Sequence, residues 1–296
     1  MTSNGLATKR FLISVLAMAC LGLAGLAAQQ TGASVAQDKP VTLAYKFPEG
    51  KALAYRTSGN EAQNMDVMGQ SISTLSRNSL EFSLKPKGLK DNNFTLGVTI
   101  DAFKISVESP QGTTSPDPAT VNGKTFDMVL SGLGKISDVS GASSIQYDMG
   151  ETGKRNIAAG FQAFFPDLPD HPVKTGDTWQ SDTTIVDKSD TSEIKIALKN
   201  EHKLDGFETV DGYECARVKT TGKGTISGVI EQGGMTLNLE GTIQATQTWY
   251  FAIKEGIYVK GDEKFGTAGT VTAGSPANLT IPITAESQGE TRLLKK

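Results

Sequence analysis

Apolar and polar residues alternate with a period of two through most of the sequence after residue 40. The first such run is Val41–Phe47, a clear internal one is Leu80–Leu84, and the last is Leu279–Ile283. Side chains of a strand point alternately to opposite faces, so this pattern predicts strands that bury one face. We therefore expect a mainly β protein of roughly ten to fourteen strands, built as a large curved antiparallel sheet or half-barrel.

Two local details of the sheet follow from the same pattern. Lys254-Glu255-Gly256 separates two alternating runs, which predicts a hairpin over Thr248–Lys260. The alternation slips by one residue at Asp101-Ala102, between Ile100 and Phe103. Such a slip predicts a β-bulge or a break in the strand, because one extra residue reverses the faces.

One segment, Glu151–Phe165, departs from the alternation and predicts a single central helix. Its apolar residues recur at i, i+1, i+4 and i+7: Ile157, Ala158, Phe161 and Phe164. Pro166 ends the pattern, since proline cannot continue a helix. We expect this helix to pack its apolar stripe against the concave face of the sheet.

The N-terminal segment has the features of a secretory signal. Lys9-Arg10 precedes an apolar stretch, Phe11–Ala28, and no acidic residue occurs before residue 38. A basic pair followed by such a stretch predicts a cleaved signal peptide, 1–36, that ends at Ser34-Val35-Ala36. Two alternatives stay open, namely a retained membrane anchor and lipoprotein processing at Cys20.

Cleavage would leave residues 37–296, which we interpret as a single β-rich extracytoplasmic domain, whether periplasmic, cell-envelope or secreted. No long flexible linker divides this region. Its halves, 37–150 and 172–296, suggest a loose internal duplication. In each half a glycine-containing turn leads into a strand that begins near an aromatic residue, Tyr55 or Trp179.

Composition excludes several classes of function. The formal net charge is −3 for the whole chain, and losing Lys9-Arg10 with the signal makes it more negative. A nucleic-acid-binding protein would instead show a basic face. Two histidines and, after cleavage, one cysteine, Cys215, leave little material for a zinc or iron–sulfur site. We therefore expect no metal, no cofactor and no internal disulfide.

Two motifs resemble a family of uncharacterised bacterial cell-envelope proteins. One is Gly134–Gly141 (GKISDVSG), and the other runs from Phe165-Pro166 to Pro172–Trp179 (PVKTGDTW). The resemblance implies an extracytoplasmic β-rich domain with no assigned activity and no catalytic residues. The predicted architecture is also similar to curved antiparallel half-barrels that carry lipids or lipoproteins across envelopes.

Candidate catalytic groups are few. His171 follows Asp170 in a proline-flanked loop, and no G-x-S-x-G nucleophile motif is present. His202 lies between Glu201 and Lys203, so we expect it to be exposed at a turn. Cys215 belongs to an alternating run, which predicts a buried, inert side chain. The sequence assigns no catalytic residue.

An apolar interior is the remaining candidate for a site. A curved sheet that closes incompletely encloses apolar space suited to lipid. The aromatic residues that could line such a cavity are Phe161, Phe164, Trp179, Trp249 and Phe251. The alternative is that these rings fill the core around the predicted helix.

The sequence as a whole favours a non-catalytic protein of the cell envelope. We expect it to bind an apolar ligand such as a lipid, or an envelope protein, but no nucleic acid. We expect no stable membrane span after cleavage of the signal. The alternatives are a structural or interaction domain without a small ligand and, less favoured, a hydrolase that uses carboxylates with displaced pKa values.

The first testable expectation concerns the N-terminus. Sequencing of the exported protein should begin at or near Gln37, because the signal is removed after Ala36. An intact N-terminus, or lipid attached to Cys20, would contradict this prediction.

Overall fold

The fold was obtained as a computed structural model that describes residues 39–295, except 48–49, 68, 151–152 and 275–277. The predicted signal peptide, 1–36, and its two alternatives therefore lie outside the described residues. In the part of the chain that is described, no helix is long and apolar enough to cross a membrane.

Twelve strands form one antiparallel sheet. They are β1 (Leu53–Val67), β2 (Gln70–Lys90), β3 (Asn93–Ser109), β4 (Gly112–Thr114), β5 (Thr125–Ser131), β6 (Ile136–Asp138), β9 (Thr178–Lys188), β10 (Ser192–Val210), β11 (Tyr213–Gln232), β12 (Met235–Ala252), β13 (Ile257–Ala273) and β14 (Leu279–Leu294). Their order is β6-β5-β3-β2-β1-β14-β13-β12-β11-β10-β9, and β4 pairs with β3 outside this path. A separate hairpin pairs β7 (Gln146–Asp148) with β8 (Lys154–Asn156).

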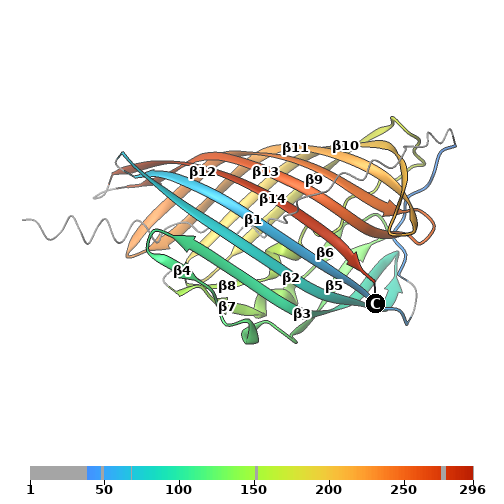
Figure 1. Cartoon of the computed structure of the whole chain (residues 1–296), viewed down its shortest axis with the longest axis horizontal. Helices are drawn as coiled ribbons and strands as arrows, with labels where there is room; N and C mark the ends of the chain where they lie inside the picture. Colours follow the sequence, from blue (N-terminus) through green and yellow to red (C-terminus); the bar gives the residue numbers. More distant parts are fainter. Residues whose placement is uncertain (1–38, 48–49, 68, 151–152, 275–277, 296) are drawn as a thin grey trace, which may run out of the picture.

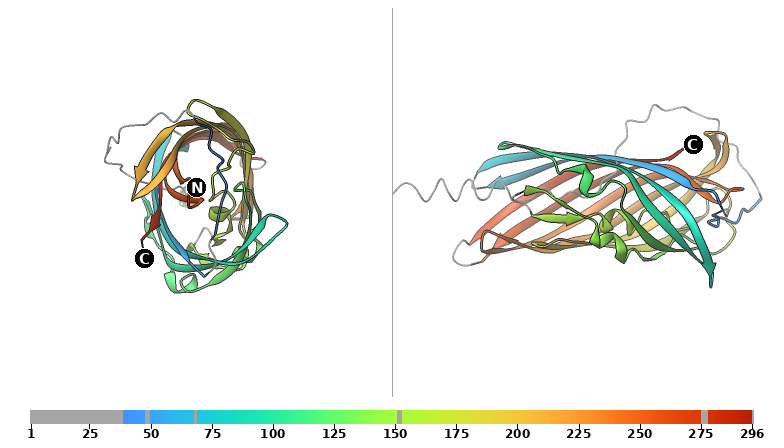
Figure 2. Two further views of the ribbon diagram at one scale, coloured as in Figure 1. Left: turned by 90° about the vertical axis from the view of Figure 1, so that its right-hand side faces the viewer. Right: turned by 90° about the horizontal axis from the view of Figure 1, so that it is seen from below.

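The sheet curls into a half-barrel, in which the strands surround a central space (Figures 1 and 2). The two edge strands, β6 and β9, are not paired with each other. Strands twist, and a sheet of many long strands curls as the twist accumulates; β2 alone has 21 residues. The mainly β half-barrel predicted from the alternation is thus confirmed. Because β1 pairs with β14, strands from both halves of the sequence share one sheet.

The predicted helix over Glu151–Phe165 is wrong. The described part of this segment contains the short strand β8 and one 3-10 turn, Ala158–Phe161. Gly153 has a left-handed backbone (φ +78°), and the Asn156 side chain accepts a hydrogen bond from the Ala158 backbone N–H. Both features replace the continuous i to i−4 bonding that a helix requires. The i, i+4 spacing of apolar residues arises because the segment is buried on several sides.

The run Val41–Phe47 is extended and alternates as predicted, but it does not join the sheet. One isolated bridge pairs Val41 with Val173, and the Tyr45 backbone N–H donates to the Gly132 carbonyl (2.9 Å). Leu43, Tyr45 and Phe47 are nevertheless buried. The segment therefore packs across the end of the half-barrel (Figure 2, left). Its alternating pattern results from burial of one side of the segment and does not require pairing with a strand of the sheet.

Two finer predictions about the sheet are confirmed. Glu81 lies opposite Ala102 and Phe82 opposite Ile100, which leaves Asp101 as the extra residue of a bulge in β3. The β12–β13 hairpin turns between Ala252 and Ile257, as its Lys-Glu-Gly sequence predicted.

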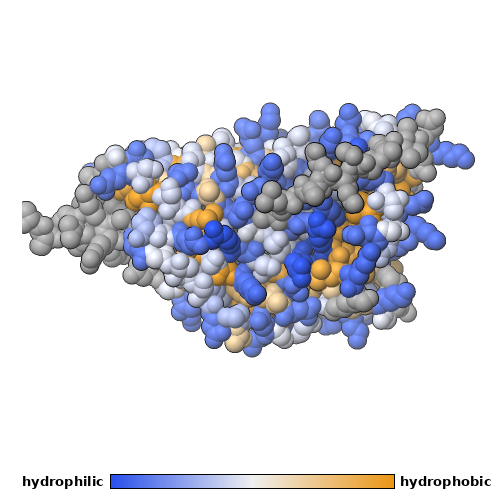
Figure 3. Space-filling model, viewed as in Figure 1, coloured by the Kyte–Doolittle hydropathy of each residue, from blue (hydrophilic) through white to orange (hydrophobic). Residues whose placement is uncertain are grey.

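Two apolar clusters occupy the two ends of the concave face. An aromatic cluster surrounds the segment between β8 and β9, where the Phe164 ring lies 4.9 Å from Phe82 and 5.2 Å from Tyr55. An aliphatic cluster at the other end includes Met65, Leu237 and Ile283. The outer face in Figure 3 is mainly hydrophilic with scattered apolar patches. The rows between the two clusters are polar, and they form the candidate site described below.

The aromatic cluster yields a stability prediction. Phe161 is fully buried, and its ring contacts Phe82 and Phe126 at 4.9 Å. Phe161→Ala should lower the free energy of unfolding by about 3–5 kcal/mol, the usual cost of truncating a buried phenylalanine. Urea denaturation measures this, with the exposed Leu89→Ala as the matched control. A change near zero for Phe161→Ala would contradict the packing described.

Candidate functional site

A layer of polar and small residues crosses the concave face between the two apolar clusters. On β1 and β2 it contains Glu61, Gln63 and Ser76, and on β10 it contains Asn200 and His202. The strand register connects these walls, since Glu61 pairs with Ser287, Ser287 with Phe265, Phe265 with Ala245, Ala245 with Gly222, and Gly222 with Asn200. We call these inward-facing residues and their immediate row neighbours the polar layer.

His202 lies within this layer, and the expectation that it is exposed at a turn is wrong. It is buried in the middle of β10, 3% exposed, with its ring stacked on Trp179 at 5.2 Å. The neighbours Glu201 and Lys203 are exposed because they point to the other face of the strand. Burial lowers the pKa of His202 to about 4, so the imidazole is neutral at physiological pH.

A chain of hydrogen bonds runs through His202. Its Nε2 lies 2.9 Å from Ser181 Oγ, and its Nδ1 lies 2.8 Å from Thr220 Oγ1. The Trp249 indole Nε1–H donates to the same Thr220 oxygen (2.9 Å). At the other end, Ser181 hydrogen-bonds the carboxylate of Asp167. Five side chains from five separate segments, the loop before β9 and the strands β9 to β12, are thereby connected.

In this series of hydrogen bonds, the groups at the two ends determine which group donates in each bond. Burial raises the pKa of Asp167, and the Ser181 hydrogen bond and the charge of Lys135 oppose this shift. When Asp167 is ionised its carboxylate only accepts, so the Ser181 hydroxyl donates to Asp167. Ser181 then accepts from the Nε2–H of His202, and because a neutral imidazole carries one proton, its Nδ1 accepts from Thr220. Thr220 in turn accepts from Trp249, whose indole can only donate. With Asp167 ionised, the hydrogen bonds have one consistent arrangement, which orients these polar groups.

A cavity of about 270 Å³ lies against this chain. Its inner end is formed by His202 and Thr220, which are buried. Small side chains on the facing strands, such as Ala245, leave the space open. Further lining residues from the sheet are Thr183, Leu198, Asn200, Gln247, Glu263 and Phe265.

The opening of the cavity lies at the side of the half-barrel, beside the edge strand β9. The exposed lining residues there are Asp182 and Thr184 on β9, together with Lys135 and Ala163; a further exposed lining residue, Thr246, belongs to β12. Lys135 and Ala163 lie on the two segments that cover the concave face, which we call the covering segments: the turn before β6 and the chain between β6 and β9. The covering segments are held close to each other at Gly134, whose φ is +97°. A Cβ there would lie 2.3 Å from the Pro166 carbonyl oxygen. A side chain at this position would force the wall apart.

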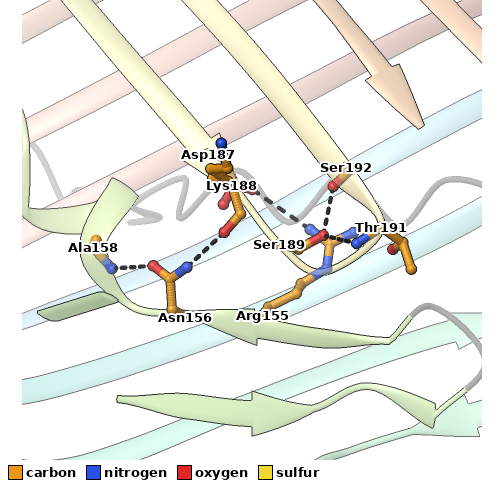
Figure 4. A network of polar contacts seen from close by, with 8 residues as sticks. All are labelled: Arg155, Asn156, Ala158, Asp187, Lys188, Ser189, Thr191 and Ser192. Carbon is orange, nitrogen blue, oxygen red and sulfur yellow. Dashed lines mark hydrogen bonds and ion pairs between the residues drawn. The ribbon is translucent and has the colours of Figure 1, made fainter. Parts of the chain in front are cut away.

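The rest of the covering segment is attached to β9 by side chains. The Gln162 amide both donates to the Val186 carbonyl and accepts from the Val186 N–H, each at 2.8 Å. Asn156 donates to the Lys188 carbonyl (2.6 Å), as Figure 4 shows. These amides occupy main-chain groups that an added strand would otherwise use.

A second group of ionisable residues lies in the interior beneath β9. Arg155 of β8 points toward Asp187 of β9, with 3.7 Å between charged atoms, and Figure 4 shows the pair beside the β9–β10 turn. Burial raises the pKa of Asp187, and the charge of Arg155 opposes this shift. Burial also raises the pKa of Glu61, on the β1 wall, to about 8, again opposed by Arg155. Glu61 is therefore mostly protonated at neutral pH.

The five aromatic residues proposed as cavity lining are all buried in the aromatic cluster, where they take three positions. Phe161 and Phe164 both pack on Phe82 in the aromatic cluster. Trp179 and Trp249 meet at 6.2 Å around His202, and Phe251 packs on Tyr45 at 5.1 Å. The aromatic rings that line the cavity are instead Phe165 and Phe265.

The remaining candidates lie elsewhere. His171 pairs with Asp170 at 2.8 Å in an exposed loop. Cys215 is fully buried, as predicted, and burial raises the pKa of its thiol to about 12. Sequence reasoning missed His202 as an interior residue, although it follows Ile194, Ile196 and Leu198 in the same alternating phase. Asp167 lies within the family motif that begins at Phe165-Pro166, but no pattern marked its side chain as part of a site.

These features define a class of protein: an open antiparallel half-barrel whose concave face is covered by its own central segment and contains a polar-walled cavity. The chain belongs to a family of unknown function, DUF6263, which matches residues 91–249. The match includes the whole hydrogen-bond chain from Asp167 to Trp249. It confirms the expectation of an uncharacterised family and assigns no activity. No curated protein matches the sequence significantly.

The burial of His202 predicts a pH dependence of stability. In the unfolded chain histidine titrates near pH 6.5, above the folded-state pKa of about 4. As pH falls between these values the unfolded state takes up more protons, so the native state loses stability, by up to about 3 kcal/mol.

Denaturation of the wild type and His202→Gln at pH 7.5 and pH 4 measures this effect. The stability advantage of the wild type over the variant should shrink toward pH 4. Denaturation of the variant His171→Gln at pH 7.5 is the control, because it removes an imidazole from an exposed position. An equal difference between wild type and His202→Gln at both pH values would contradict a buried neutral imidazole.

Proposed function

We propose that this protein is a non-catalytic binding protein that acts outside the cytoplasm and holds a small ligand in the cavity beside β9. The observation that carries the proposal is the cavity itself, about 270 Å³, with polar groups of fixed orientation at its inner end. Binding sites typically combine an apolar wall with a few well-placed polar groups. Phe165 and Phe265 supply the apolar wall here.

The composition of the walls narrows the expected ligand. A long acyl chain would favour a wholly apolar interior, whereas this cavity is bordered by Asp167, His202 and Thr220 at close range. Its volume is just below the usual range of small-molecule pockets, about 300–1,000 Å³. A compact amphipathic ligand, or the polar end of a larger one, therefore fits better than a lipid tail.

The polar layer costs stability, which supports a role in binding. Gln63 and Ser76 are 1% and 4% exposed, and within the described structure their Nε2 and Oγ atoms have no hydrogen-bond partner. Each such buried group costs about 1–3 kcal/mol. An apolar layer joining the two clusters would be more stable, so we infer that the polar layer is retained for recognition.

The hydrogen-bond directions support a role without catalysis. Ser181 and His202 lie at the 2.9 Å separation of a nucleophile and its base. Here, however, with Asp167 ionised, the Nε2–H of His202 donates to Ser181, and the Ser181 hydroxyl donates to Asp167. The imidazole cannot accept that proton in this arrangement, and a pKa of about 4 makes it a weak base.

Addition of a partner strand at the β9 edge is less well supported. The edge is occupied at Val186 and Lys188 by the amides of Gln162 and Asn156. The uncapped stretch of β9, around Asp182 and Thr184, borders the cavity opening. We therefore assign this stretch to ligand entry.

Filling the cavity tests the proposal. Ala245→Leu places a larger side chain in the cavity, and Ala268→Leu makes the same change at an exposed position of the neighbouring strand. Native mass spectrometry of protein purified from the cells that produce it should show a small bound species. The species should be present in the wild type and Ala268→Leu and absent from Ala245→Leu.

Two results would contradict the proposal. One is wild-type protein that carries no bound species, and the other is a species that Ala245→Leu retains. Thermal unfolding of both variants checks that they are folded.

A further inference from the structure

The turn between β2 and β3 projects past the neighbouring strands at one end of the half-barrel (Figure 2, teal). Asp91 and Asn92 form this turn, and both have a left-handed backbone (φ +50° and +59°), as a tight two-residue hairpin requires. The Gly132 N–H donates to the Asn92 carbonyl (3.1 Å), which attaches the turn to the chain between β5 and β6. The hairpin tip is therefore a projection with a defined position.

Leu89 lies at this tip, with 62% of its surface exposed. It pairs with Phe94 across the hairpin, and the Phe94 ring lies 5.0 Å from Phe47 in the aromatic cluster. Paired residues of antiparallel strands share one face of the sheet, so Leu89 continues an apolar row of the core out into solvent. Removing such a side chain from water would be favourable.

Lysines accompany the exposed leucine on the same hairpin. Lys85, Lys87 and Lys90 are all exposed, and Lys87 pairs with Asp127 of β5 (2.5 Å). From residue 85 to residue 93 the hairpin holds these three lysines and one aspartate, Asp91. The tip thus combines an apolar side chain with an excess of positive charge.

The two ends of the half-barrel differ in charge. At the end that carries the tip, the Lys46 ammonium donates to the Lys254 carbonyl (3.1 Å), which places two more exposed lysines beside the β12–β13 turn. The opposite end is formed by the β1–β2, β9–β10 and β11–β12 turns, and its exposed acidic residues are Asp66, Asp190, Glu193 and Glu231. The molecule therefore has a basic end, although its formal net charge is −3.

We infer that the basic end docks on an anionic lipid membrane, with Leu89 inserted between the headgroups and the lysines beside the lipid phosphates. An anionic surface attracts lysines that lie within a Debye length of it. A shallowly inserted apolar side chain adds to this attraction by leaving water. The residues involved do not line the cavity beside β9, so this inference is independent of the proposed ligand.

The shape of the tip favours a membrane over a protein partner. A stable protein interface buries about 800 Å² on each partner, whereas this projection presents one apolar side chain on a narrow hairpin. A lipid surface needs no complementary shape, because headgroups move aside around an inserted residue.

Vesicle binding by the wild-type protein is the first test. Cosedimentation with phosphatidylglycerol vesicles should be at least about tenfold stronger than with phosphatidylcholine vesicles, because several lysines contribute about fivefold each near an anionic surface. About 0.5 M NaCl should abolish the binding, since salt screens exposed charges.

Variants then locate the surface. Leu89→Ser and the double variant Lys85→Gln/Lys90→Gln should each weaken binding to phosphatidylglycerol vesicles at least about tenfold. The matched controls are Val229→Ser, which removes an exposed apolar side chain near the acidic end, and Lys195→Gln/Lys199→Gln, which removes two exposed lysines of β10. Neither control should change the binding. Because all variants share the same N-terminal apolar stretch, its contribution cancels in the comparison.

A tryptophan at the tip reports insertion directly. Leu89→Trp should show a blue-shifted emission with phosphatidylglycerol vesicles and quenching by brominated acyl chains. Val229→Trp should show neither, and the two native tryptophans, Trp179 and Trp249, are buried and supply a constant background.

Three results would overturn the inference. One is the absence of binding to phosphatidylglycerol vesicles, and another is binding that Leu89→Ser retains in full. The third is an acidic protein trapped by a photo-crosslinker at position 89 in the producing cells, without vesicle binding, which would assign the tip to a protein partner instead.

Discussion

The concave face of an open, curled sheet has to be covered, and the rest of this structure depends on how that is done. The covering comes from the chain between β6 and β9, anchored where Phe161 and Phe164 pack on Phe82. Half-barrels of this size cannot fill their interior with sheet side chains alone. The anchored segment therefore belongs to the core and also forms a wall of the cavity. Its position determines which part of the half-barrel interior stays empty.

The cavity follows from that anchoring. Beyond Phe164 the backbone is held at Leu168, whose N–H donates to the Leu133 carbonyl (2.8 Å), and this course brings Asp167 to Ser181 and Phe165 to the cavity wall. The Trp179 indole also donates to the Asp167 carbonyl (3.0 Å), so the same loop is held by main chain as well as side chain. The polar layer then fixes its own hydrogen bonds around His202. The aromatic cluster stabilises the fold, and the proposed ligand recognition is assigned to the adjacent polar layer.

The sequence predicted what depends on local periodicity. Alternation identified the strands, the bulge at Asp101 and the β12–β13 hairpin, because each is set by neighbours along the chain. The helix prediction was wrong because i, i+4 spacing indicates a helix only when the apolar residues are buried on one side. Phe161 and Phe164 are instead buried by contacts from several strands. His202 was misjudged from its charged neighbours, although the phase of its strand pointed inward. The pairing of Asp167 with Ser181 depends on long-range packing, and no local pattern encodes it.

The central claim is that the space beside His202 is where a ligand binds, and the two tryptophans of the sequence allow a direct measurement. The Trp249 indole N–H donates to Thr220, which borders the cavity. In a ¹⁵N-labelled protein, occupation of the cavity by the copurifying species should shift the Trp249 indole resonance together with the amide resonances of Asn200 and Gln247. Resonances of outward-facing residues such as Lys195 should stay in place. Shifts confined to the outer face, with the Trp249 indole unchanged, would contradict the account.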